Sequence, residues 1–351
     1  MKRRAPLSDV ALRLGAVLLA VVFTTGVLLL AGAPPLEAYR QILVGSLGSV
    51  KKLTDVMVAW VPLLLATSGL MMTFAAGLWN IGIEGQITLG AIFATGMLRL
   101  TLGGSLPPEI AIVAALVAGI IGGAIWALLA GLLKAYGGVN EIFGGLGLNF
   151  VAVALTVWLI FGPWGRPGVA SMSGTEPFPA AYSLPALAGL RLSPWAVLLA
   201  VGGFLLVFFL LQGTTFGLRL KAVGKNPRAA FLLGIPTVRY MLLAFVLCGG
   251  LGGAAGAVQV TAVYHRLIPA ISSGYGYLGL MVAMLVNYQP MWMPVVAFFF
   301  AALNLGSIQL PIVLKLDSSL AGVLQGALVL FVLGVEGIRQ RMRRPQAKVA
   351  E

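Results

Sequence analysis

The chain has 351 residues, of which 60% are hydrophobic and only 9% are charged, whereas soluble domains carry about 25% charged residues. Together with a mean hydropathy of +1.01, this composition excludes a soluble globular protein and indicates an integral membrane protein. The formal net charge of +13 does not indicate a nucleic-acid-binding surface, because the basic residues gather between apolar runs, as they do in the cytoplasmic loops of membrane proteins.

Apolar runs follow one another along the whole chain. The runs lack the alternation of apolar and polar residues that is typical of β-strands. We therefore expect an all-α, polytopic helical bundle with about ten transmembrane helices, within a range of eight to eleven. The first run could also be read as a signal peptide, but its length of about 20 residues exceeds the usual apolar core of such a segment, so an uncleaved span is preferred. The expected spans are 14–33, 56–76, 87–102, 109–133, 142–161, 194–212, 240–263, 278–288, 291–308 and 319–337.

Four groups of basic residues set the expected orientation. They lie at the N-terminus, at Lys134, from Arg219 to Arg239, and from Arg339 to Lys348. With ten spans all four groups fall on one side, so both termini are expected in the cytoplasm. The chain reads as a single transmembrane domain, 1–351, without a soluble domain, and the absence of GxxxxGK[ST] means that it has no P-loop of its own.

Residues 79–86 read WNIGIEGQ and lie between two of these apolar runs. An intramembrane carboxylate costs at least about 2.5 to 3.5 kcal/mol on insertion scales, so Glu84 should face the bundle interior or a water-filled path. Gly82 and Gly85 would allow the helix to break there, as in the discontinuous helices of transporters. A short cytoplasmic turn is the alternative, and the local pattern does not separate the two.

Further polar residues occur at the fifth and eighth expected spans. Asn140 could cap a helix whose first turn holds Glu141, and Asn149 lies eight residues later on nearly the same face. A hydrogen bond between helices is the alternative role for Asn149. With Asn287 in the eighth span, these residues complete the candidates for a substrate path, the others being Asn80, Glu84 and Gln86.

The basic loop 213–239 contains a helix signal of its own. Asn226 is a good N-cap, Pro227 suits the first helical position and Gly234 can end the turn, so we expect a short helix over 227–233. Such a helix could dock onto a partner, or it could be a connector that binds anionic headgroups.

Three stretches resemble a known family. GLWNIGIEGQITLGA at 77–91, GGVNEIFGGLGLNFVA at 137–152 and AVGKNPRAAFLLGI at 222–235 are similar to motifs in permease subunits of bacterial ATP-binding-cassette (ABC) importers of the branched-chain amino acid, ribose and nucleoside group. The first two are most similar to the larger permease of nucleoside importers, with Phe150 where Tyr is commoner. The resemblance extends over roughly residues 56–335.

The resemblance implies a type II ABC-importer fold in the cell membrane of a bacterium and a transport subunit that is not itself an enzyme and needs no cofactor. Its implied partners are a separate ATPase subunit, a second similar permease chain and an external substrate-binding lipoprotein, and its implied solute is a nucleoside, with a ribose-like sugar or a branched-chain amino acid as alternatives. Loop 213–239 would hold the coupling helix. The residues implied in contact with the ATPase are Gly224, Asn226, Pro227, Arg228, Ala229, Ala230 and Gly234.

Two rival functions follow from the residues alone. A secondary carrier could use Glu84 or Glu141 for proton coupling, and transport without ATP would favour it. An intramembrane enzyme has little support, because the only histidine is His265 and no Ser/His or HExxH arrangement lies inside a span.

Glycine is the other prominent feature of the expected spans. Many of the 46 glycines lie inside them, which predicts close approach of helices. A second junction with glycine and polar residues, ISSGYGYLG at 271–279, parallels WNIGIEGQ and suggests an inverted repeat. Cys248 has no second cysteine with which to form an internal disulfide.

Overall fold

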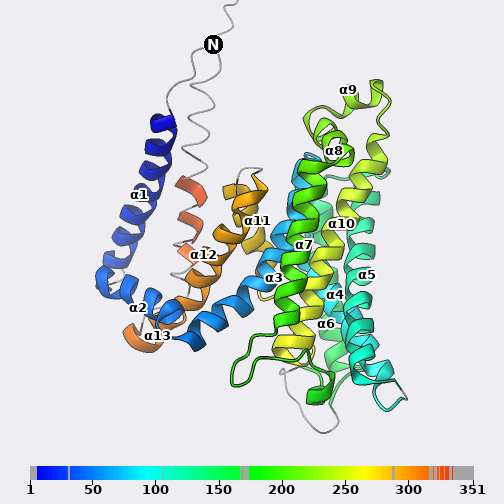
Figure 1. Ribbon diagram of the computed structural model, residues 1–351, viewed down its shortest axis with the longest axis horizontal. Coiled ribbons are helices and arrows are strands. Elements are labelled where there is room, and N and C mark those ends of the chain that lie inside the picture. Colours follow the sequence, from blue (N-terminus) through cyan, green and yellow to red (C-terminus); the bar gives the residue numbers. More distant parts are fainter. Residues whose placement is uncertain are drawn as a thin grey trace, which may run out of the picture. The chain divides into compact units, whose positions relative to one another are not determined.

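The computed structural model describes residues 6–30, 32–104, 106–166, 168, 174–286, 289–315, 319, 322–323, 325–327, 329–331 and 334. Within these ranges every regular element is a helix, which confirms the all-helical expectation (Figure 1). The chain forms two compact units, one made of 54–301 and the other of 1–53 with 302–351.

Six helices in the described ranges are long and apolar enough to cross a membrane, and a seventh span arises if a pair of helices bent by 110° counts as one. That pair belongs to α1 (Pro6–Leu30) and α2 (Pro35–Leu47). The expectation of about ten spans stays a prediction. The six are α3 (Val50–Ala75), α5 (Pro108–Ala135), α6 (Glu141–Phe161), α7 (Pro194–Gly213), α10 (Thr237–Val258) continued by the π-helix η2 (Gln259–Tyr264), and Pro290–Leu314, which contains η3 (Pro290–Trp292), α12 (Met293–Gly306) and α13 (Gln309–Leu314).

Two further expected spans are present as shorter or more polar helices. The expected span 87–102 lies in α4 (Ile83–Thr101), and the expected span 278–288 overlaps α11 (Tyr275–Val286), which has only 12 residues. The last expected span, 319–337, falls in part outside the described residues.

Glycines bring α4, α5 and α10 into backbone contact in the larger unit. Gly253 of α10 lies against Gly90 of α4 and against Gly119 and Gly123 of α5, so closely that a Cβ atom at 253 would overlap the Gly119 carbonyl. Gly256 likewise lies against the Ile87 carbonyl. The predicted close approach of helices is therefore confirmed at these positions, where only a residue without a side chain fits.

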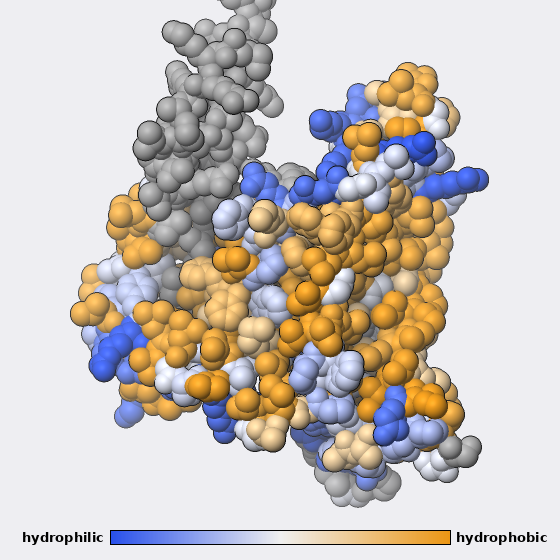
Figure 2. All heavy atoms as spheres, viewed as in Figure 1, coloured by the Kyte–Doolittle hydropathy of each residue, from blue (hydrophilic) through white to orange (hydrophobic). Residues whose placement is uncertain are grey.

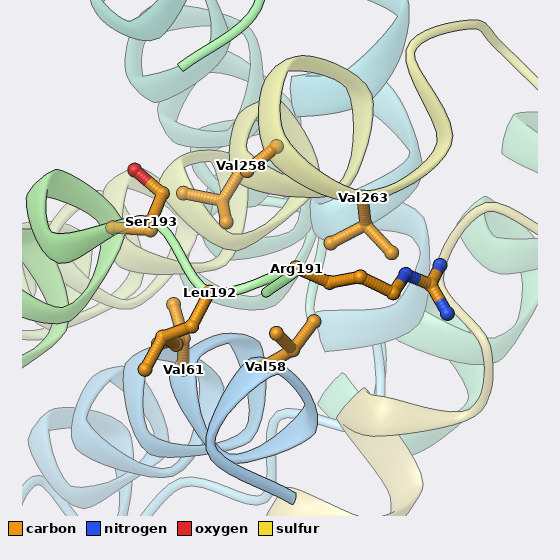
Figure 3. A pocket seen from close by; sticks show the side chains of 9 residues that line it. Val58, Val61, Arg191, Leu192, Ser193, Val258 and Val263 are labelled. Carbon is orange, nitrogen blue, oxygen red and sulfur yellow. The ribbon is translucent and has the colours of Figure 1, made fainter. Parts of the chain in front are cut away.

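The loop before α7 is joined by hydrogen bonds to η2 and to the segment that follows it. The backbone N–H groups of Thr175, Phe178 and Leu184 donate to the carbonyls of Leu267 (2.9 Å), His265 (2.8 Å) and Thr261 (2.9 Å). This loop contains the short 3-10 helix η1 (Ala180–Tyr182). A small apolar cleft lies beside it, with valines from α3 and from the α10–η2 helix on facing sides and Arg191 extending away from them (Figure 3).

The other end of α7 leads to two short helices, α8 (Thr215–Lys225) and α9 (Pro227–Leu232). Thr214 caps α8 by accepting a hydrogen bond from the Gly217 N–H at 3.1 Å. Near the end of α8, Gly224 lies against the backbone of Ala75, Ala76 and Gly77, at the end of α3.

The smaller unit is built from α1, α2 and α13. Leu28, Ala38, Ile42 and Leu310 form its buried apolar cluster. The expected span 14–33 overlaps α1, which begins earlier, at Pro6, and ends at Leu30.

Candidate functional site

The stretch WNIGIEGQ lies between the end of α3 and the first turns of α4. Gly77 adopts φ 73°, and its N–H donates to the Phe74 carbonyl (3.0 Å) while the Leu78 N–H donates to the Thr73 carbonyl (2.9 Å). This hydrogen-bond pair is a Schellman motif, which requires a left-handed residue and so favours glycine. It ends α3 and turns the chain inward, and the region that follows, which we call the α3–α4 junction (residues 77–86), carries the predicted polar residues.

The polar side chains of the junction are buried and are not those of an exposed turn. Asn80 is 0%, Glu84 6% and Gln86 1% exposed. Burying a polar group costs free energy unless the group is hydrogen-bonded, so these side chains need hydrogen-bond partners within the bundle.

Asn80 and Gln86 satisfy each other. Asn80 Nδ2 donates to Gln86 Oε1 at 3.1 Å, and Gln86 Nε2 donates to Asn80 Oδ1 at 3.0 Å. Asn80 Nδ2 also lies 3.1 Å from the sulfur of Cys248 in α10. The pair thus closes the irregular segment onto the first turn of α4 and joins it to α10.

Two residues on one face of α6, Gly145 and Asn149, contact the same junction. Asn149 Nδ2 donates to the Ile81 carbonyl at 3.0 Å, and its Oδ1 accepts from the Gly85 N–H at 2.8 Å. One turn earlier, Gly145 lies against Gly82, where a Cβ atom would come within 2.6 Å of the Gly82 nitrogen. Asn149 therefore serves two backbone groups that the break between α3 and α4 leaves without helical partners.

Asn140 and Glu141 lie at the start of α6. Asn140 Oδ1 accepts from the Ile142 N–H at 2.9 Å, so this residue is an N-cap. Glu141 forms an ion pair with Lys134 of α5 at 2.7 Å. The two residues thus fix the α5–α6 turn. The face of α6 that Glu141 and Asn149 were expected to share stays a prediction.

Glu84 connects the junction to α11. Its Oε1 accepts from the Tyr277 N–H at 3.2 Å, and Gly276 packs against Ile83 and the Glu84 backbone. The Ser272 hydroxyl lies close enough to interact with the carboxylate. Oε2 is buried, and within the described ranges no hydrogen bond of acceptable geometry reaches it.

The structure thus brings together Asn80, Glu84 and Gln86 of the junction with Asn149 of α6, from two parts of the sequence. It adds Cys248 and Tyr277, which sequence reasoning did not select, since a lone cysteine in an apolar run and a backbone N–H carry no local signal. Asn287 lies outside the described residues. In the described part of the chain no group of three His, Cys, Asp or Glu side chains is placed to hold a metal ion.

The short helix expected over 227–233 is present as α9 (Pro227–Leu232). Asn226 Oδ1 accepts from the Ala229 N–H at 3.1 Å, and Gly234 adopts φ 79°. Ala230 packs inward, whereas three successive apolar side chains are exposed, namely Phe231 (67%), Leu232 (85%) and Leu233 (79%). We call these three residues the α9 tip. Figure 2 shows apolar surface at this end of the unit with hydrophilic surface around it.

Comparison with known proteins adds a family match. The model of the permease component of branched-chain amino acid transport systems matches residues 52–333. A glucose ABC transporter permease of Haloferax volcanii is 30% identical over 91% of this chain and 86% of its own length. Two guanosine ABC transporter permeases of Bacillus subtilis are 24% and 26% identical, over 98% and 82% of this chain and 99% and 91% of their own lengths.

Proposed function

Since this chain belongs to the family of permease components of branched-chain amino acid transport systems, we propose that it is the membrane subunit of an ATP-driven importer. Its role is transport, and ATP hydrolysis falls to a separate ATPase subunit. The other partners in this proposal are a substrate-binding lipoprotein outside the membrane and a second permease chain.

The observation that carries the proposal is the α9 tip. Phe231, Leu232 and Leu233 expose apolar side chains at the end of a helix that is capped by Asn226 and set in a loop with Arg219, Lys221, Lys225, Arg228 and Arg239. The positive charge of this loop supports a cytoplasmic position, and exposed apolar patches are typical of binding surfaces. We propose that the α9 tip binds in a groove on the ATPase subunit. The residues that shape this coupling helix are Gly224, Pro227, Ala229, Ala230 and Gly234.

A nucleoside is the solute that we favour. Two relatives are named guanosine permeases, and another is named a glucose permease, so a sugar is the second candidate. Ribose in a nucleoside and a hexose share a ring with several hydroxyl groups. The occurrence of two guanosine permeases in one organism supports a heterodimer of permease chains.

We place the translocation path beside Glu84. The amides of Asn80, Gln86 and Asn149 are engaged with each other, with Cys248 or with the backbone, so in this conformation they hold the junction together. Glu84 keeps one buried oxygen without a hydrogen bond among the described residues, and a hydroxyl of the solute or a water molecule would satisfy it. Asn140 and Glu141 would border the cytoplasmic end of the path. Asn287 stays a candidate path residue on the ground of its position in the sequence alone.

The proposed topology keeps about ten spans with both termini in the cytoplasm, which the distribution of basic residues supports. An inverted repeat is supported by the direct contact between the two glycine-containing junctions, in which Glu84 of the first meets Gly276 and Tyr277 of the second.

Reconstitution tests the function directly. The chain is expressed with candidate ATPase, permease and lipoprotein subunits from its own organism, and uptake of labelled guanosine and of labelled glucose is measured in proteoliposomes. We expect uptake that requires ATP and the lipoprotein. Uptake driven by a proton gradient without ATP would instead identify a secondary carrier.

A further inference from the structure

One end of the α3–α4 junction touches the cytoplasmic helices. A Cβ atom on Gly77 would lie 2.8 Å from the Gly224 carbonyl oxygen, and one on Gly224 would overlap the Ala75 carbonyl. These two segments therefore meet backbone to backbone, without flexible side chains between them. A displacement of α8 would therefore move the junction at Gly77 as well, because closely packed backbones are hardly compressible.

The other end of the junction touches α11. Glu84 lies seven residues after Gly77 and accepts the Tyr277 N–H at 3.2 Å. Gly276 has room for no side chain there, since a Cβ atom would lie 2.8 Å from Ile83 Cγ2 and 3.0 Å from Glu84 Cγ. The N-terminal N–H groups of a helix have no partners within the helix, and a carboxylate at that end is favoured by the helix dipole.

The structure also provides a hinge before α11. Ser273 and Gly274, the two residues that precede it, both adopt positive φ angles, 50° and 74°. Tyr277, in the first turn, is 44% exposed. Hinges are a few terminal residues that absorb backbone rotation, so α11 can turn about 273–274 once its contact with Glu84 changes.

We infer that Glu84 is a positioning residue that holds the N-terminus of α11, and that segment 77–84 transmits movement of α8 and α9 to α11. This inference rests on the proposed function, because it requires an ATPase that moves α9. It differs from a merely structural role for Glu84 in requiring that the contact with α11 change with the nucleotide state of the ATPase.

Thiol labelling in the assembled importer tests the inference. Tyr277→Cys keeps the backbone N–H that Glu84 accepts, and its alkylation rate by a membrane-impermeant maleimide is measured without nucleotide and after trapping with ATP and vanadate. We expect the rate to differ between the two states. Adding Glu84→Ala should remove the difference and lower uptake about tenfold, the effect of losing one charged hydrogen bond. Glu84→Gln, whose amide oxygen still accepts the N–H, should retain the labelling difference.

Matched variants separate the contact from folding and from charge. Glu109→Ala removes an exposed carboxylate from the first turn of α5 and should behave like the parent. If Glu84→Ala does not fold, Gly276→Ala disturbs the same contact without removing a charge, and Gly202→Ala, which meets no atom within 4 Å, is its control. Gly276→Ala should lose the nucleotide-dependent labelling difference, and Gly202→Ala should keep it.

The outcomes also separate this inference from the proposed function. The transmission role is wrong, and the importer assignment stands, if the ATPase copurifies and hydrolyses ATP while the labelling rate at 277 does not depend on the nucleotide. The same conclusion follows if Glu84→Ala or Gly276→Ala keeps both the labelling difference and uptake. If no ATPase associates with the parent chain, the proposed function itself is wrong.

Discussion

Asn80 and Gln86 are joined by two hydrogen bonds that run in opposite directions, at 3.1 Å and 3.0 Å, between side chains that are almost fully buried. They are six positions apart in the sequence. Asn80 lies in the break between α3 and α4, and Gln86 lies in the first turn of α4. The pair therefore fixes an irregular backbone in a place where water is excluded.

Removing one partner should cost more than removing both. Asn80→Leu leaves the Gln86 amide buried and unpaired, which we expect to lower stability by about 1–3 kcal/mol. In the double variant Asn80→Leu/Gln86→Met no amide is left unpaired, so part of this loss should be recovered. Thermal unfolding of the purified protein in detergent, followed for the parent, both single variants and the double variant, checks this. Strictly additive losses would show that the two side chains do not depend on each other.

The glycine packing of α10 gives a sharper comparison within one helix. Gly253→Ala places a methyl group against the Gly119 carbonyl, whereas at Gly250 the nearest atom to a new Cβ, Ile120 Cγ2, lies 3.5 Å away. We expect Gly253→Ala to abolish the monodisperse peak in size-exclusion chromatography and Gly250→Ala to preserve it, since overpacking costs about 1–3 kcal/mol or more. Equal behaviour of the two variants would contradict the packing of α4, α5 and α10 described above.

Local sequence signals predicted some elements well. Asn226, Pro227 and Gly234 predicted a helix over 227–233, and α9 runs from Pro227 to Leu232, because capping and helix termination depend on neighbouring residues.

The environment of WNIGIEGQ could not be predicted from local pattern. Its partners Asn149, Cys248 and Tyr277 lie 64, 168 and 193 residues from the groups that they contact, and a sequence reading has no access to such distances. The π-helix over Gln259–Tyr264 was also missed, because an extra residue in a helical turn leaves no trace in hydropathy.

His265 should make the loop segment before α7 sensitive to acid. Burial first, and the charge of Arg191 second, hold the pKa of His265 below its ordinary value, so the folded state favours the neutral ring, whose Nδ1 lies 2.9 Å from Ser183 Oγ. Because the unfolded chain takes up this proton at a higher pH than the folded chain, stability is present above a pH of about 6.5 and falls as the pH drops through the folded-state value.

The measurement is the midpoint of thermal unfolding between pH 8 and pH 5. We expect the parent to lose more stability on acidification than His265→Gln, which has no titrating group, and Arg191→Gln to lie between them. An identical pH profile for the parent and His265→Gln would show that this ring does not contribute.

The central claim is that the α9 tip docks on an ATPase subunit, and copurification of that subunit tests it most directly. Leu232→Ser/Leu233→Ser removes exposed apolar surface and leaves the Asn226 N-cap and the backbone N–H of the C-cap residue 233 in place, so the chain should fold and insert while the copurified ATPase and the substrate-stimulated ATP hydrolysis are lost. Gly224→Val and Ala229→Asp should also uncouple transport, the former through its backbone contact with α3. Arg219→Gln should do much less, since exposed charges contribute about 0–1 kcal/mol. If Arg219→Gln releases the ATPase while Leu232→Ser/Leu233→Ser retains it and stays coupled, the loop is an electrostatic tether and the claim is wrong.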